Sequence, residues 1–133
     1  MKSILVAALL SLASAVCYGQ EFTENGNDLM VQCQSAVKFF DHEQLDGADH
    51  VHAAYCIGYV SAILDLDAMW LGMDKKAGVK NLSVHICSPD GGGVAVSQAV
   101  RILVKWLKNN PEKLDWRGET VVVLALRQAF PCQ

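Results

Sequence analysis

The chain has 133 residues, of which 52% are hydrophobic and 19% charged, and its formal net charge is −3. This length is typical of one domain. The small acidic excess excludes the basic face on which nucleic-acid binding usually depends, so we expect no nucleic-acid partner.

The first 20 residues, MKSILVAALLSLASAVCYGQ, have the pattern of a secretory signal peptide: an early lysine, a short apolar run and then small residues. Cleavage is predicted after Ala15 or after Gly19. Lipid attachment at Cys17 is a third alternative, which the bulky residue before it disfavours. The second cut defines 1–19 as the signal peptide and 20–133 as a single domain. No later stretch is expected to be long and apolar enough to cross a membrane.

The first two predicted helices are joined by a polar turn. Asn27 or Thr23 is the expected N-cap of the first helix, and Asp49 that of a long second helix ending near Gly72. The first helix is indicated by apolar residues at helical spacing: Leu29, Cys33, Ala36, Val37 and Phe40.

Residues 73–93 form the longest irregular segment, with five glycines or prolines and no sustained period. Loops of this length in compact domains are usually functional or mobile. A third helix follows and stops at residues 109–111. Its predicted inward side chains are Val96, Ala99, Val100, Leu103 and Leu107.

The last segment is ambiguous because its β-branched run, residues 120–123, could form a buried strand. No second strand of similar quality exists to pair with it. We therefore predict a fourth, buried helix, capped by Asp115 and ended by Pro131.

The predicted fold is all-α: a small disulfide-linked bundle of four main helices with a long loop between the second and third. After cleavage at residue 19 four cysteines remain, and an even number in a small exported chain predicts two disulfides. Of the three possible pairings, antiparallel neighbouring helices favour Cys33 with Cys56 and Cys87 with Cys132, because each pair lies at the same height.

Small residues recur along one side of the second helix and end at a carboxylate. Gly58 is predicted to be a packing glycine, where another helix approaches closely, and Asp65 to lie at the edge of that seam. Two questions stay open: whether the seam packs within one chain or across a dimer, and whether Asp65 is simply exposed to solvent.

No set of residues predicts catalysis, a metal site or a cofactor. The acidic, histidine-containing turn at residues 41–52 lacks zinc-ligand spacing, and Cys87 beside His85 would be consumed by its disulfide. The glycines at 91–93 lack the rest of a phosphate-binding motif. We therefore predict that the protein is no enzyme. Trp70, beside the irregular segment, is the aromatic residue expected to stay partly exposed as a contact.

An ordered set of short motifs runs through the chain after the signal peptide: Cys33, Cys56-Ile57-Gly58-Tyr59 with Asp65, Cys87-Ser88-Pro89, Gln98 and Val100, Leu107 to Pro111, Ala125-Leu126, and Phe130-Pro131-Cys132. In this set, which covers nearly all of its length after the signal peptide, the chain resembles the Rap/Tai immunity proteins of type VI secretion systems.

The resemblance implies a small periplasmic protein, often a homodimer, that binds a cognate toxic effector and inhibits it by occlusion. That effector is commonly a secreted peptidoglycan amidase, and the immunity protein itself catalyses nothing. The irregular segment is the predicted protrusion into the effector. The expected contacts are Lys75, Lys76, Lys80, Asn81, His85 and Asp90.

The alternative function is a small periplasmic acid-stress chaperone or adaptor. Such a protein would be an acid-sensitive dimer, with histidines at the dimer face. The candidates are His42, His50 and His52.

Overall fold

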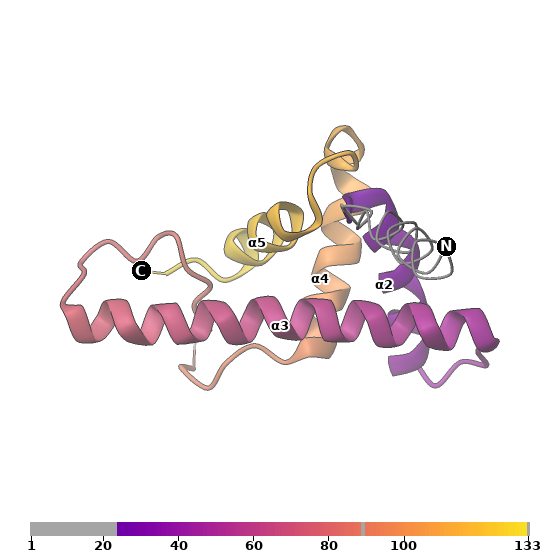
Figure 1. The fold of residues 1–133 in the computed structure, drawn as a ribbon, viewed down its shortest axis with the longest axis horizontal. Helices are drawn as coiled ribbons and strands as arrows, with labels where there is room; N and C mark the ends of the chain where they lie inside the picture. Colours follow the sequence, from indigo (N-terminus) through magenta and orange to yellow (C-terminus); the bar gives the residue numbers. More distant parts are fainter. Residues whose placement is uncertain (1–23, 89, 133) are drawn as a thin grey trace, which may run out of the picture.

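The computed structural model describes residues 24–88 and 90–132, and the regular elements of this part of the chain are all helices (Figure 1). The elements are α2 (Gly26–Phe40), α3 (Gly47–Ala77), α4 (Val96–Asn109), the short 3-10 helix η1 (Pro111–Lys113) and α5 (Gly118–Ala129). The long α3 lies across α2, α4 and α5 and spans the length of the molecule. The prediction of an all-α bundle with four main helices is confirmed. The predicted signal peptide lies outside the described residues.

The first two helices begin at side-chain caps. The Asn25 side chain accepts hydrogen bonds from the backbone N–H groups of Asn27 and Asp28, which satisfies donors that lack a partner within the helix. Asp46 caps α3 in the same way and accepts from the N–H of Asp49 at 2.7 Å. The predicted caps Asn27 and Asp49 were wrong, because both residues lie in the first turn; Thr23 is outside the described residues.

The α3 helix is longer than predicted. It continues through Gly72 to Ala77 and ends where Gly78 adopts the left-handed conformation, with φ of 74°. One glycine inside a helix costs about 1 kcal/mol relative to alanine, which good helix formers on both sides can outweigh. The irregular segment is therefore residues 78–95, and the predicted bounds 73–93 were wrong.

The core lies among the four main helices, and most of its buried side chains come from α2, α4 and α5. Its largest fully buried side chains are leucines and valines from all four helices, Leu29, Val60, Leu103 and Leu126 among them. Of the five α4 side chains predicted to face inward, four are fully buried and Val96 is partly buried. Cys33 and Cys56 join α2 to α3 inside this core through a disulfide with an S–S distance of 2.05 Å.

The last helix confirms the helical interpretation of the β-branched run, since residues 120–123 lie within α5. The predicted cap Asp115 was wrong: α5 begins after Arg117 without a side-chain cap, and Asp115 accepts a hydrogen bond from the Asn27 side chain at 3.0 Å. After α5, Cys132 forms a disulfide with Cys87. Both predicted disulfides are thus confirmed.

Much of α3 faces outward. Only three of its 31 residues are buried, namely Ala53, Cys56 and Val60. By length and composition alone the helix could cross a membrane, which corrects the expectation that no later stretch reaches that threshold. The buried disulfide at Cys56 attaches α3 to α2. Carboxylates of α3 bind the loop that follows the helix, as described below.

Candidate protein-binding surface

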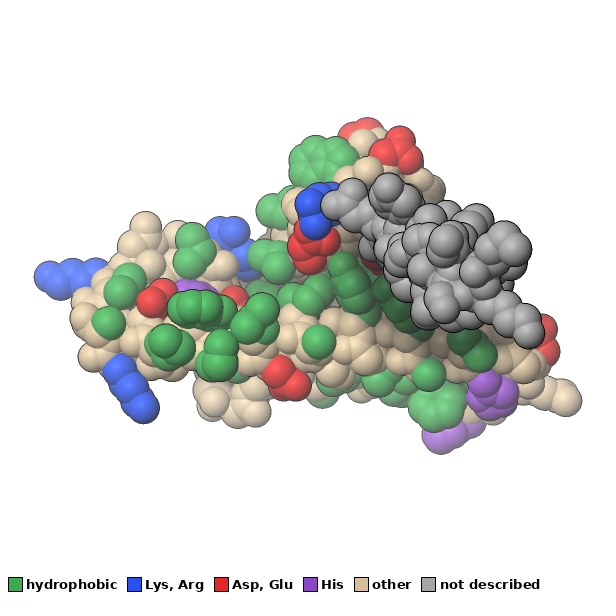
Figure 2. All heavy atoms as spheres, viewed as in Figure 1, with side chains coloured by type: hydrophobic (Ala, Val, Ile, Leu, Met, Phe, Trp, Pro, Cys, Tyr) green, Lys and Arg blue, Asp and Glu red, His purple; other side chains and the backbone are tan. Residues whose placement is uncertain are grey.

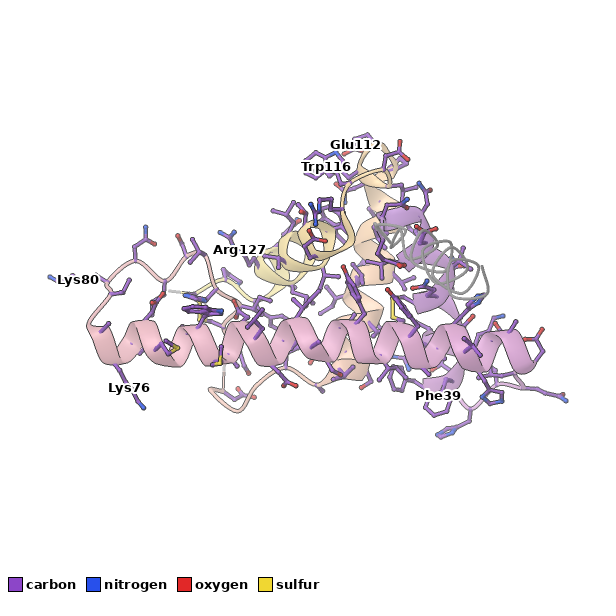
Figure 3. All side chains as sticks on the ribbon, viewed as in Figure 1. Phe39, Lys76, Lys80, Glu112, Trp116 and Arg127 are labelled. Atoms are coloured by element: carbon purple, nitrogen blue, oxygen red, sulfur yellow. A yellow bond between two sulfur atoms is a disulfide. The ribbon has the colours of Figure 1, made fainter. Side chains whose placement is uncertain are left out.

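The end of α3 and the loop after it form one end of the molecule. Lys75 and Lys76 lie in the last turn of the helix, and the N–H of Gly78 returns to the carbonyl of Lys75 at 3.2 Å. Glycine suits this position because a left-handed backbone costs it little. Lys80 and Asn81 follow in the loop, and both are exposed. Figure 3 shows Lys76 and Lys80 extending outward at this end.

The loop is held to α3 by His85 and two carboxylates. The His85 ring lies between Asp67 and Asp74: Nδ1 is 3.1 Å from Asp67 Oδ1, and Nε2 is 2.9 Å from Asp74 Oδ2. The other oxygen of Asp67 accepts the backbone N–H of Ile86 at 2.9 Å. We refer to His85, Asp67 and Asp74 as the His85 clamp.

The electrostatics of the clamp favour a charged imidazole. The pKa of His85 is raised above its ordinary value of 6.5, first by its hydrogen bond to Asp74 and then by its interactions with Asp67, while burial opposes the shift. The side chain of His85 is 7% exposed. The sequence predicted that His85 contacts an effector. In the structure both ring nitrogens bind carboxylates of α3 and so attach the loop to the helix. The effector contact stays a prediction.

A second attachment joins the same loop to the end of α5. The N–H of Cys87 donates to the carbonyl of Phe130 at 2.9 Å, beside the disulfide between Cys87 and Cys132. Arg127 of α5 donates to the carbonyl of Ser83. The loop is therefore fixed to α3 on one side and to α5 on the other, and residues 78–82 project between these attachments.

A groove of about 680 Å³, open to solvent, lies between α3 and the part of the loop around residues 86–95. Gly91 and Gly93 have φ of 68° and 90°, so their backbone adopts conformations that other residues rarely take. Asp65 is exposed and lines this groove, and Asp90 is exposed beside it. The sequence showed no sign of the groove. Its apolar lining comes from Leu64, Ala68, Leu71, Ile86, Val94 and Ala95.

An apolar patch lies on α3 next to this end. Its members are about half exposed and share one side of the helix: Leu66, Met69, Trp70 and Met73. Trp70 is 49% exposed, which fits the expectation that it stays outside the core. Figure 2 shows hydrophobic side chains gathered over this half of α3, with lysines at the tip.

Gly58 does not pack against any described part of the chain. It is exposed, and no described atom lies within 4 Å of the position that its Cβ would occupy. Of the two possibilities for the small-residue seam, packing on another part of the described chain is therefore wrong. The described residues also contain no group of three or more His, Cys, Asp or Glu side chains arranged to hold a metal.

These features define a class: a small, disulfide-linked helical protein that presents an exposed loop on a fixed frame. The sequence pattern of the Rap1a immunity proteins matches residues 25–132. The chain belongs to this family. Comparison with curated proteins and with solved structures found no match.

Proposed function

We propose that this chain is a periplasmic immunity protein that binds and occludes a type VI secreted peptidoglycan amidase, and that it catalyses nothing itself. It would protect the producing cell and its kin from that toxin. Family membership supports the immunity role. Two disulfides and the predicted signal peptide, residues 1–19, support export to an oxidising compartment.

The observation that carries the inhibitory mode is the loop itself. Residues 78–82 lie between attachments on α3 and α5, with Lys80 among them and Lys75 and Lys76 in the helical turn before them. A fixed loop loses little conformational entropy on binding, which favours its insertion into a concave site. The proposed effector contacts are Lys75, Lys76, Lys80, Asn81 and Asp90.

The proposed partner can be tested by capture and inhibition. The mature chain would be used as bait in a periplasmic extract of the producing bacterium, and a captured amidase would be assayed on purified peptidoglycan. We expect the wild-type chain to abolish that activity. Capture of unfolded periplasmic proteins at acid pH, without an amidase, would support the chaperone alternative and contradict the proposal.

The loop is tested with matched variants. Lys75→Ala/Lys76→Ala/Lys80→Ala should weaken binding to the captured amidase by at least about tenfold, since interface anchors each contribute about 1 kcal/mol or more. Lys105→Ala/Lys108→Ala removes exposed lysines of α4 and should bind like the wild type. If the α4 variant loses binding and the loop variant keeps it, the loop is not the inhibitory element.

The chain also forms a homodimer in this proposal, through an exposed stripe of α3. The stripe runs the length of the helix at spacings of three and four: Val51, Tyr55, Gly58, Ala62, Leu66, Met69 and Met73. Small residues lie in its middle and large apolar ones towards its ends. A stripe of this kind allows a second helix to approach closely at the centre and bury side chains on either side.

An antiparallel pair of α3 helices centred on Ala62 is self-complementary, as a two-fold interface must be. Val51 then lies opposite Met73, Tyr55 opposite Met69, and Leu66 opposite Gly58, so a large side chain faces the glycine next to the centre. Charges agree with this direction, since each helix begins with acidic side chains and ends with Lys75 and Lys76. Each acidic start would lie near the partner's basic end, which also suits the helix dipoles.

A further inference from the structure

We infer that the His85 clamp is a proton-dependent attachment that fixes the 78–88 loop to α3 and loosens when His85 loses its proton. The inference begins with the geometry of the ring. Both ring nitrogens lie within 3.1 Å of carboxylate oxygens that belong to different residues, Asp67 and Asp74. Among the described residues of this loop, no other side chain has two polar atoms that each contact a carboxylate.

The number of N–H donors decides which form of histidine fits. A carboxylate only accepts hydrogen bonds, and a neutral imidazole has one N–H, so it can satisfy one of the two aspartates. Its other nitrogen would then point a lone pair at a negatively charged oxygen about 3 Å away. Only the imidazolium donates to both, so the attached loop holds a proton that a free loop at neutral pH releases.

The neighbouring charges do not replace that proton. Arg127 of α5 donates to the carbonyl of Ser83, and Lys113 lines the same hollow on that side of the loop. On α3, Lys75 lies next to Asp74 and lines the groove with Asp67. None of these cations is bonded to either clamp carboxylate within the described residues.

The two aspartates that contact His85 differ in their exposure to solvent and in their other hydrogen bonds. Asp67 is 15% exposed and its second oxygen holds the N–H of Ile86, whereas the side chain of Asp74 is 36% exposed. Deprotonation should therefore break the contact with Asp74 first. That loosens the segment between Gly78 and Ser83, while Arg127 still binds the carbonyl of Ser83 and the disulfide at Cys87 still retains the end of the loop.

The direction of the pH dependence follows from the raised pKa of His85. The attachment is fully present below the ordinary histidine pKa of 6.5 while the carboxylates stay ionised, and it is lost as the pH rises through the raised value. This inference bears on effector binding only through the proposed role of the loop. Its test uses the mature chain alone, so its failure would leave the immunity role standing.

The test is amide hydrogen exchange of residues 79–86 between about pH 6 and pH 9, expressed as protection factors corrected for intrinsic exchange. In the wild type we expect protection to fall by at least about tenfold across this range, because the neutral ring loses one of its two charge-assisted hydrogen bonds. Asp74→Asn should make protection independent of pH, since its amide can donate to the neutral ring. His85→Gln should lower protection at pH 6 and remove the pH dependence.

His50→Gln changes an exposed histidine at the other end of α3 and should behave like the wild type. The Asp74→Asn variant keeps the size of the side chain and the His85 ring, so the test does not depend on whether His85→Gln folds. A wild-type protection factor that is constant with pH overturns the inference. So does an Asp74→Asn variant that keeps the wild-type slope.

Discussion

Gly26 and Gly58 both lie within helices, but their surroundings are opposite. A Cβ on Gly26 would lie 2.9 Å from the carbonyl oxygen of Leu114 and 3.0 Å from its Cα, so the backbone of another segment excludes it. A Cβ on Gly58 would meet no described atom. The first glycine permits a close approach within the protomer, and the second leaves room that Leu66 of a second copy would fill in the proposed dimer.

Alanine should therefore have opposite effects at these two glycines. We expect Gly26→Ala to lower the free energy of unfolding by about 1 to 3 kcal/mol, through overpacking against the main chain of Leu114. Gly58→Ala should raise that of the separated protomer by about 0.5 to 1 kcal/mol, because alanine is the better helix former. Urea unfolding of both variants measures the two changes. A destabilising Gly58→Ala would show that its Cβ site is occupied.

His85 and Gly58 show what local sequence patterns cannot supply. The sequence placed His85 beside Cys87 and suggested a contact surface, whereas its partners lie 18 and 11 residues earlier on α3. The small residues around Gly58 predicted a close approach, but a spacing pattern does not say which chain approaches. In both cases the missing information was tertiary.

The sequence predicted the number and order of the helices and the pairing of the disulfides better than it predicted the residues at which the helices begin and end. Helical spacing and the heights of Cys33 and Cys56 gave the antiparallel pair and its bridge. The end of α3 was misplaced because Gly72 resembles a stop signal locally, and only Gly78 adopts the left-handed backbone of a helix end. The groove could not be predicted, since it depends on how residues 86–95 fold back on α3.

The two disulfides should contribute similarly to stability and differently to the loop. Their sequence separations are 23 and 45, for which loop-closure entropy gives about 3 and 4 kcal/mol at 25 °C. We expect Cys33→Ser/Cys56→Ser and Cys87→Ser/Cys132→Ser each to lose stability of this order in urea unfolding.

Only the Cys87→Ser/Cys132→Ser variant should also increase hydrogen exchange in residues 79–88, because its bridge attaches the loop to α5. The Cys33→Ser/Cys56→Ser variant serves as the control for general destabilisation. Equal increases in both variants, at matched free energy of unfolding, would mean that the bridge does not restrain the loop.

For the whole molecule, the exposed stripe of α3 predicts the state of association. Gly58→Leu should place a bulky side chain at the centre of the proposed antiparallel pair and convert the dimer to a monomer. Because nothing described occupies that Cβ site, the protomer should still fold. Light scattering after size-exclusion chromatography measures the mass, and circular dichroism checks the helices.

Gln98→Leu adds the same side chain to an exposed position of α4 and should remain dimeric. A wild type that is monomeric at every concentration tested would contradict the dimer. A dimeric Gly58→Leu variant would move the interface away from this stripe.

The disulfide between Cys87 and Cys132 also sets an order of assembly. For a chain that leaves the cytoplasm with its N-terminus first, Cys33 and Cys56 emerge early and can join α2 to α3 at once. Cys87 has to wait for Cys132, and all of α4 and α5 lie between them. The bridge that joins the loop to the end of α5 thus closes last, and a precursor kept in a reducing compartment would carry neither bridge.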